Sequence, residues 1–184
     1  MTELASSAQL RGSLFRWVLV LVPVTLLLGF LLGAMAGSGP ENPWLAALNK
    51  PSIYPPPATF GLVWSVLYAL MGLAAALVAC AHGAWDREKA LGVFGVQLLL
   101  NLAWTPLFFA FHQITAALVL LIALDVAVVA TIVMFRRVRP VAAWLLLPYL
   151  AWILFATFLN WEFRIANPDA DGLEVSGAVT RIEF

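Results

Sequence analysis

The chain has 184 residues, of which 63% are hydrophobic and only 11% are charged, and its formal net charge is zero. A soluble domain carries about 25% charged residues, so this chain could not cover a water-facing surface, and a lipid bilayer is the solvent that fits it. No basic run is long enough to indicate nucleic-acid binding, and the single cysteine, Cys80, excludes an internal disulfide and a multi-cysteine metal site.

Five apolar segments follow one another along the chain, over residues 14–36, 60–81, 90–111, 114–135 and 140–161. Each has about 22 residues, enough for a helix to cross a hydrocarbon core of about 30 Å. We therefore expect an all-α fold, an integral membrane bundle of five transmembrane helices over residues 14–161. An N-terminal tail (residues 1–13) would precede it, and a polar C-terminal tail (residues 162–184), expected to be poorly ordered, would follow it.

The segments between these spans contain residues that end helices or resist burial. Residues 37–40 and the prolines at 55–57 interrupt the helix after the first span and before the second. The charged residues 86–89 and 136–139 form the next polar breaks, and the short turn at 112–113 makes spans three and four an antiparallel hairpin. The first span is longer than the apolar core of a signal peptide, so we expect it to be retained.

Basic residues are distributed unequally between the two ends of such a bundle. Seven lie on the side of the N-terminus and three on the other: Arg11, Arg16, Arg87, Lys89, Arg136, Arg137 and Arg139 against Lys50, Arg164 and Arg181. Because basic residues favour the cytoplasmic side, we expect a cytoplasmic N-terminus. A bacterial inner membrane is the location this bias favours, since insertion there sets such a bias.

Two residue types could carry chemistry inside the membrane. Asp125 is the one carboxylate deep within a span, and it is either a hydrogen-bonded packing group, near Gln97 or Asn101, or the proton carrier of a transporter. The two histidines, His82 and His112, end consecutive antiparallel spans and so lie on opposite membrane faces. They cannot ligate one haem iron together, and we expect no metal site and no cofactor required for folding.

Small and aromatic residues recur at helical spacing. Gly29, Gly33 and Gly37 form a small-residue face on the first span, which allows close helix packing within the bundle or between protomers. Aromatic and amide residues share one face in spans two, three and five: Phe60, Trp64, Tyr68 and Met71; Asn101, Trp104 and Phe108; Trp152, Phe155, Ala156, Leu159 and Asn160. Turned inward, these faces either pack as an ordinary core or wall an apolar cavity for a flat ligand.

Three blocks of residues are also similar to a known family. They are Trp44-x₃-Leu48-Asn49-Lys50-Pro51-Ser52-x₂-Pro55-Pro56 with Phe60-Gly61-x-Val63-Trp64-x₂-Leu67-Tyr68; Gln97-Leu98-x-Leu100-Asn101-x₂-Trp104-x-Pro106-x-Phe108-Phe109; and Pro148-Tyr149-Leu150-Ala151-Trp152-x₂-Phe155-Ala156-Thr157-x-Leu159-Asn160. In this order they resemble the TspO/MBR family, the tryptophan-rich sensory proteins, also called translocator protein or peripheral-type benzodiazepine receptor. The resemblance covers residues 44–160.

The resemblance implies a five-helix bundle that forms a homodimer and binds porphyrins or other tetrapyrroles, under a first loop that acts as a lid. The implied ligand-binding residues are Trp64, Asn101, Trp104, Phe108, Trp152, Phe155, Ala156 and Leu159, and the implied loop residues are Lys50, Pro51 and Pro55. Family members often carry tryptophan where this chain has Ile53 and Ala58. The sterol motif of the family needs a tyrosine that is absent near Arg164, so we do not infer sterol binding.

The function we expect is therefore a membrane-embedded sensor, regulator or translocator that binds a porphyrin by stacking tryptophans on it in an apolar cavity. A binding protein is favoured over an enzyme. The first alternative is light-dependent porphyrin breakdown, for which the resemblance implies Trp64 and Trp152 as electron donors. The second is a proton-coupled transporter that uses Asp125, and the third is an assembly factor whose cavity is incidental.

Overall fold

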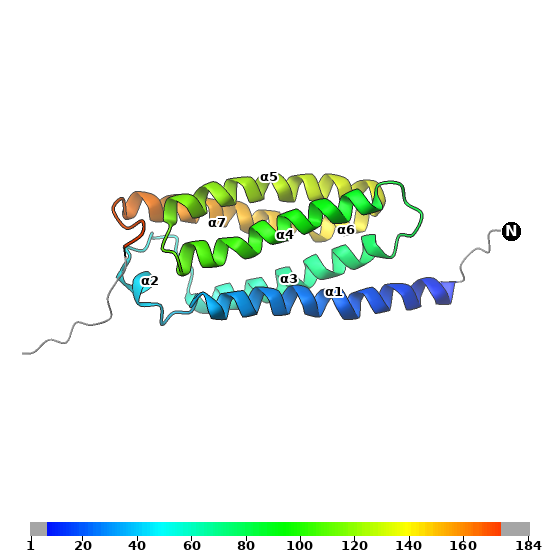
Figure 1. Cartoon of the computed structure of the whole chain (residues 1–184), viewed down its shortest axis with the longest axis horizontal. Coiled ribbons are helices and arrows are strands. Elements are labelled where there is room, and N and C mark those ends of the chain that lie inside the picture. Colours follow the sequence, from blue (N-terminus) through cyan, green and yellow to red (C-terminus); the bar gives the residue numbers. More distant parts are fainter. Residues whose placement is uncertain (1–6, 174–184) are drawn as a thin grey trace, which may run out of the picture.

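The computed structural model describes residues 7–173, and it is a bundle of long helices that lie side by side (Figure 1). Five segments are long and apolar enough to cross a membrane: Arg11–Met35, Pro57–Ala79, Arg87–Phe109, Ile114–Val138 and Pro140–Ala166. Helices satisfy their own backbone hydrogen bonds, which is why an apolar chain in lipid adopts them. The all-α, five-span prediction is confirmed.

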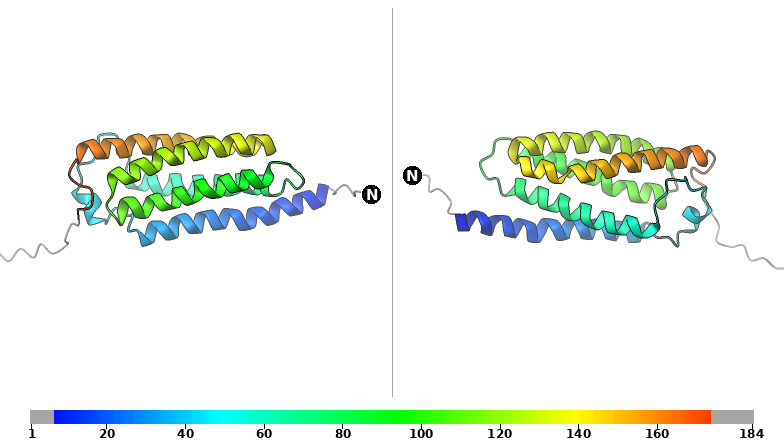
Figure 2. Two further views of the ribbon diagram at one scale, coloured as in Figure 1. Left: turned by 45° about the horizontal axis from the view of Figure 1, so that its top comes forward. Right: turned by 180° about the vertical axis from the view of Figure 1, so that it is seen from behind.

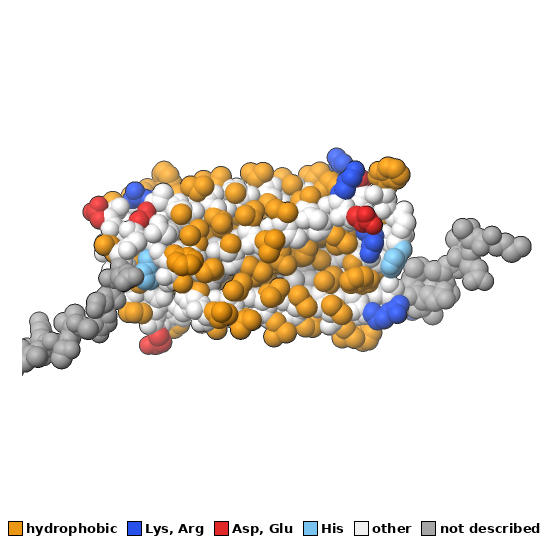
Figure 3. All heavy atoms as spheres, viewed as in Figure 1, with side chains coloured by type: hydrophobic (Ala, Val, Ile, Leu, Met, Phe, Trp, Pro, Cys, Tyr) orange, Lys and Arg blue, Asp and Glu red, His pale blue; other side chains and the backbone are white. Residues whose placement is uncertain are grey.

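Helices that are neighbours along the chain also pack together. α1 (Ser7–Met35) lies against α3 (Pro57–Ala79), and α4 (Arg87–Phe109) pairs with α5 (Ile114–Val138) across a short turn (Figure 2). α6 (Pro140–Leu145) and α7 (Leu147–Ala166) return along α5. Apolar side chains cover the long sides of the bundle and most charges gather at its two ends (Figure 3). We call the end from which α1 starts the inner end and the opposite one the outer end.

The fifth span is two helices instead of the one expected over residues 140–161. α6 ends at Leu145, and the backbone N–H of Leu146 bonds back to Ala143 and Trp144 before α7 begins. Pro148 has no N–H to donate to the carbonyl four residues earlier, and its ring would clash there. The break therefore follows from one proline within a segment whose apolar pattern predicts a single continuous helix.

The first and last helices are longer than predicted. α1 already begins at Ser7, and α7 runs on to Ala166. After it, the Gly172 N–H donates to the His112 carbonyl at 2.9 Å, and the Asp171 carboxylate accepts from the Thr115 backbone N–H at 3.0 Å. The expectation of a poorly ordered tail is thus wrong for residues 162–173, while residues 174–184 lie outside the described part of the chain.

α1 and α3 approach closely because glycines remove the side chains between them. A Cβ on Gly72 would lie 2.6 Å from the Cα of Val22, and one on Gly29 would lie 2.2 Å from the Tyr68 ring. The Thr25 hydroxyl donates across the same contact to the Tyr68 carbonyl at 2.8 Å. Gly29 of the predicted small-residue face therefore serves packing inside the bundle.

Candidate ligand cavity

The outer half of the bundle encloses a cavity of about 490 Å³. This volume lies within the range of small-molecule sites, about 300–1,000 Å³. Residues from α1, α3, α4, α5 and α7 and from the loop after α1 line it, and none of these described lining residues is Asp, Glu, Lys, Arg or His. The cavity is therefore suited to an apolar, uncharged body.

Seven of the eight expected ligand-binding residues line this one cavity: Trp64, Asn101, Trp104, Phe108, Trp152, Ala156 and Leu159. Phe155 does not line it; its ring packs against Trp152, with centroids 5.3 Å apart. Lys50, Pro51 and Pro55 also lie outside the lining, whereas Tyr54 of the same loop and Pro57 at the start of α3 belong to it. The aromatic faces are thus brought together, and the expected loop residues are not.

Aromatic rings form the walls in stacked and edge-on pairs. Trp104 stacks on Phe108 with centroids 5.2 Å apart, and Trp64 stacks on Tyr68 at 5.1 Å. Phe60 meets Trp152 edge-on at 5.9 Å. Rings in such pairs hold one another's orientation, so the cavity presents preformed flat surfaces to a ligand.

A polar pair interrupts the apolar lining. The Tyr68 hydroxyl donates to the Asn101 Oδ1 at 2.9 Å, and both residues are almost fully buried. This bond occupies the carbonyl oxygen of the Asn101 amide, so the Nδ2 group is the hydrogen-bond donor that Asn101 brings to the cavity. Asn101 can therefore offer one donor to an acceptor atom on a bound ligand. Trp104 Nε1 points instead to Asn160 Oδ1, at 3.4 Å.

The loop after α1 closes the outer end, and sequence reasoning did not foresee how. It contains a short helix, α2 (Pro43–Ala47), whose Trp44 is 2% exposed, stacks on His112 with centroids 4.6 Å apart and meets Phe108 edge-on. The Asn49 N–H donates to Asn167 Oδ1 at 2.8 Å, and Asn167 Nδ2 donates to the Asn49 carbonyl at 3.0 Å. We call this reciprocal pair the asparagine clasp. It joins the segment between α1 and α3, named the lid loop after the role expected of it, to the end of α7.

The cavity reaches the molecular surface beside the last turns of α1. Phe30, Ala34, Gly37, Gly39 and Pro40 line it and are also exposed. Sequence reasoning assigned Gly37 to a helix-packing face and did not predict that the last turns of α1 and the residues after them line a cavity. Tyr54, on the opposite side of the loop, is partly buried between Phe60 and Phe163, and burial raises the pKa of its phenol.

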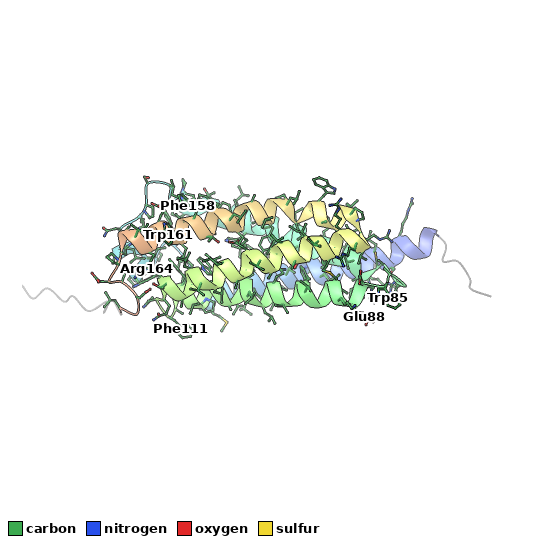
Figure 4. The ribbon with its side chains drawn as sticks, turned by 90° about the horizontal axis from the view of Figure 1, so that it is seen from above. Trp85, Glu88, Phe111, Phe158, Trp161 and Arg164 are labelled. Carbon is green, nitrogen blue, oxygen red and sulfur yellow. The ribbon has the colours of Figure 1, made fainter. Side chains whose placement is uncertain are left out.

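Asp125 has a different partner from the one expected. Its Oδ2 accepts from the Thr157 hydroxyl at 2.9 Å, and its Oδ1 is buried with no partner among the described residues. Gln97 and Asn101 bond to Tyr149 and Tyr68 instead. Asp125 does not line the cavity. Phe158 and Trp161, which follow Thr157 on α7, are exposed and point away from the bundle (Figure 4).

Comparisons with known proteins show the family of this chain. The model of the TspO/MBR family matches residues 20–166. This chain belongs to the TspO/MBR family. It is similar to the translocator protein of Homo sapiens, with 44% identity over 136 residues, which are 73% of this chain and 80% of that protein.

Microbial members of the TspO/MBR family match comparably. The tryptophan-rich protein TspO of Archaeoglobus fulgidus is 42% identical over 124 residues, covering 67% of this chain and 80% of that protein. The protein CrtK of Rhodobacter capsulatus is 34% identical over 139 residues, covering 74% and 86%. The matched stretches cover 67–74% of this chain and 80–86% of these three relatives.

Proposed function

We propose that this TspO/MBR protein binds a porphyrin or a similar flat tetrapyrrole in its outer cavity and acts as a membrane sensor, regulator or translocator for it. The observation that carries the proposal is a cavity of about 490 Å³ that Trp64, Trp104 and Trp152 help to line, with no charged side chain among its described lining residues. Such a cavity stabilises a flat aromatic ring by stacking and by removing it from water.

The lining also suggests how the ligand would be oriented. Protoporphyrin IX carries two propionates, and burying a carboxylate without a cation is costly. The apolar edge of the ring would therefore enter first, toward Tyr68 and Asn101, and the propionates would stay at the mouth beside Gly37 and Gly39. Histidine, cysteine and methionine, three common axial ligands of haem iron, are absent from the described lining residues.

Titration of protoporphyrin IX into the detergent-purified protein, followed by tryptophan quenching, tests this proposal. Trp152→Ala removes a cavity wall, and Trp85→Ala is the matched control, because Trp85 is 92% exposed at the inner end (Figure 4). We expect saturable quenching that weakens in Trp152→Ala and not in Trp85→Ala. Identical, non-saturating quenching in all three proteins would contradict the proposal.

A second candidate function is light-dependent breakdown of the bound porphyrin. It is favoured by one observation, that Trp64 and Trp152, the residues implied as electron donors, both line the cavity. Illumination of the protein with protoporphyrin IX in air should then yield bilin-like products with the wild type. Trp152→Phe should retain binding and lose the products; products that persist in this variant would exclude Trp152 as the donor.

We also propose a homodimer with a cytoplasmic N-terminus in a bacterial inner membrane. The family resemblance supports the dimer, and the seven-to-two division of the described basic residues between the two ends supports the orientation. Light scattering of the detergent-solubilised protein measures its oligomeric state. Reporter fusions at each end of the chain test the orientation. Activity of an N-terminal reporter that works only outside the cytoplasm would contradict the proposed orientation.

A further inference from the structure

Three arginines are crowded at the corner where α5 passes into α6. Arg136, Arg137 and Arg139 lie within four consecutive residues, immediately before Pro140, and all three are exposed. The ion pair found in residues 7–173 is elsewhere, between Arg164 and Asp171 at the outer end, 3.9 Å apart. The corner thus presents three guanidinium groups that form no ion pair with any carboxylate of the described residues.

The corner lies where lipid headgroups would be. It belongs to the inner end of the bundle, where Lys and Arg side chains gather next to the apolar belt (Figure 3). Long basic side chains at such a position run along the apolar surface and place their charge at headgroup level. Guanidinium groups bind the oxygens of phosphates, as of carboxylates, through two parallel hydrogen bonds.

An apolar patch adjoins the arginines. Val141 and Trp144 of α6 and Leu147 at the start of α7 follow one another at three-residue spacing and are all exposed, Trp144 by 70%. Tryptophan prefers the membrane interface, where its ring contacts acyl chains and its N–H stays near the headgroups. A free phosphate ion would use the arginines alone, whereas a phospholipid would use both parts of the surface.

We propose that the α5–α6 corner is a binding site for an anionic phospholipid. Arg136, Arg137 and Arg139 hold the headgroup phosphate, and Val141 and Trp144 contact the upper part of the acyl chains. The site is at the end of the bundle opposite the ligand cavity and does not depend on what the cavity binds. It also does not depend on which leaflet the inner end faces, because it is defined by the corner itself.

Other basic residues of the inner end offer a matched control. Arg11 and Arg16 are exposed on α1 and Lys89 is exposed on α4, so their charges are spread over separate helices. Arg87 is unsuitable, since its Nε donates to the Ala79 carbonyl at 2.8 Å and holds the loop between α3 and α4. Arg11→Gln/Arg16→Gln/Lys89→Gln removes the same charge from the same end as Arg136→Gln/Arg137→Gln/Arg139→Gln.

Native mass spectrometry of the full chain in detergent, titrated with palmitoyl-oleoyl phosphatidylglycerol or phosphatidylcholine, tests the proposal. One basic residue near an anionic surface is worth roughly a fivefold change in affinity. We expect the wild type to prefer phosphatidylglycerol, the corner variant to lose at least about tenfold of that affinity, and the control variant to lose less than about threefold. Trp144→Ala should weaken binding of both lipids by a few-fold.

Three results would overturn the proposal. Equal losses in the two triple variants would mean diffuse attraction to the whole inner end, and no loss in the corner variant would mean that the lipid binds elsewhere. Displacement of the lipid by millimolar inorganic phosphate would mean a simple anion site without acyl-chain contacts. Thermal unfolding of each variant checks its fold, and the exposed arginines make a large shift unexpected.

Discussion

The same helices pack in opposite ways in the two halves of the bundle. In the inner half, Ala74, Ala75, Ala90 and Ala142 are almost fully buried and let the helices close on one another around Phe94 and Phe135. In the outer half, large aromatic rings stack on each other and hold the helices around a cavity of about 490 Å³. Small side chains therefore allow the helices to pack closely in the inner half. In the outer half, the stacked rings hold the helices apart and leave a cavity between them.

The largest effect should come from placing one bulky residue in each half. Ala156→Phe adds a ring to the cavity wall, where there is space, and should abolish porphyrin binding with little loss of stability. Ala75→Phe, at a site only 1% exposed, has no such space and should cost about 1–3 kcal/mol or more in overpacking. Binding titrations and thermal unfolding measure both; equal destabilisation would refute a preformed cavity.

The two buried tyrosines distinguish the halves in a second way. Tyr68→Phe leaves Asn101 unpaired at the cavity and free to turn its amide, so it should weaken ligand binding several-fold and cost about 1 kcal/mol of stability. Tyr149→Phe leaves Gln97 unpaired in the closed half, where the penalty is about 1–3 kcal/mol. We expect Tyr149→Phe to lower the unfolding temperature without changing affinity; a change in affinity would link Gln97 to the cavity.

Sequence reasoning found the spans and the walls of the cavity for a clear physical reason. Apolar length determines which segments cross lipid, and helical spacing determines which residues share a face, so Trp64, Asn101 and Trp152 were placed together correctly. Phe155 shares the same periodic face but lies at its edge, against Trp152 and outside the cavity lining. Periodicity gives a face and does not give its boundary.

The lid could not be predicted in the same way. The asparagine clasp joins Asn49 and Asn167, which are 118 positions apart, and no local sequence pattern predicts a contact between such distant residues. The α1 wall was missed because Gly33 and Gly37 line the cavity with backbone alone. The α6–α7 break was a different kind of omission, since Pro148 was visible in the sequence within an otherwise continuous apolar run.

The third prediction concerns the asparagine clasp, which we expect to control the dissociation rate of porphyrin more than its affinity. Asn167→Ala removes both hydrogen bonds to Asn49, so the lid loop should detach more often and porphyrin should leave about tenfold faster, with stability changed by about 1 kcal/mol. Stopped-flow dissociation measures the rate. Ser52→Ala, an exposed substitution in the same loop, is the control and should leave the rate unchanged. Unchanged dissociation in Asn167→Ala would mean that the ligand passes beside α1 and not under the lid.

The smallest effect should follow from Asp125→Asn, and it bears on the remaining hypothesis of proton-coupled transport. Asparagine keeps an oxygen for the Thr157 hydroxyl, so the contact between α5 and α7 should survive with a stability change below about 0.5 kcal/mol. If Asp125 only packs, porphyrin flux into protein-containing vesicles and its pH dependence should match the wild type. Thr157→Val is the companion variant, because it removes the donor and leaves the carboxyl unpaired. Loss of the pH dependence in Asp125→Asn, with Thr157→Val still pH-dependent, would instead show that the carboxyl carries a proton. The contact between α5 and α7 at Asp125 would then change during transport, and the contrast between a closely packed half and an open half would not hold at this contact.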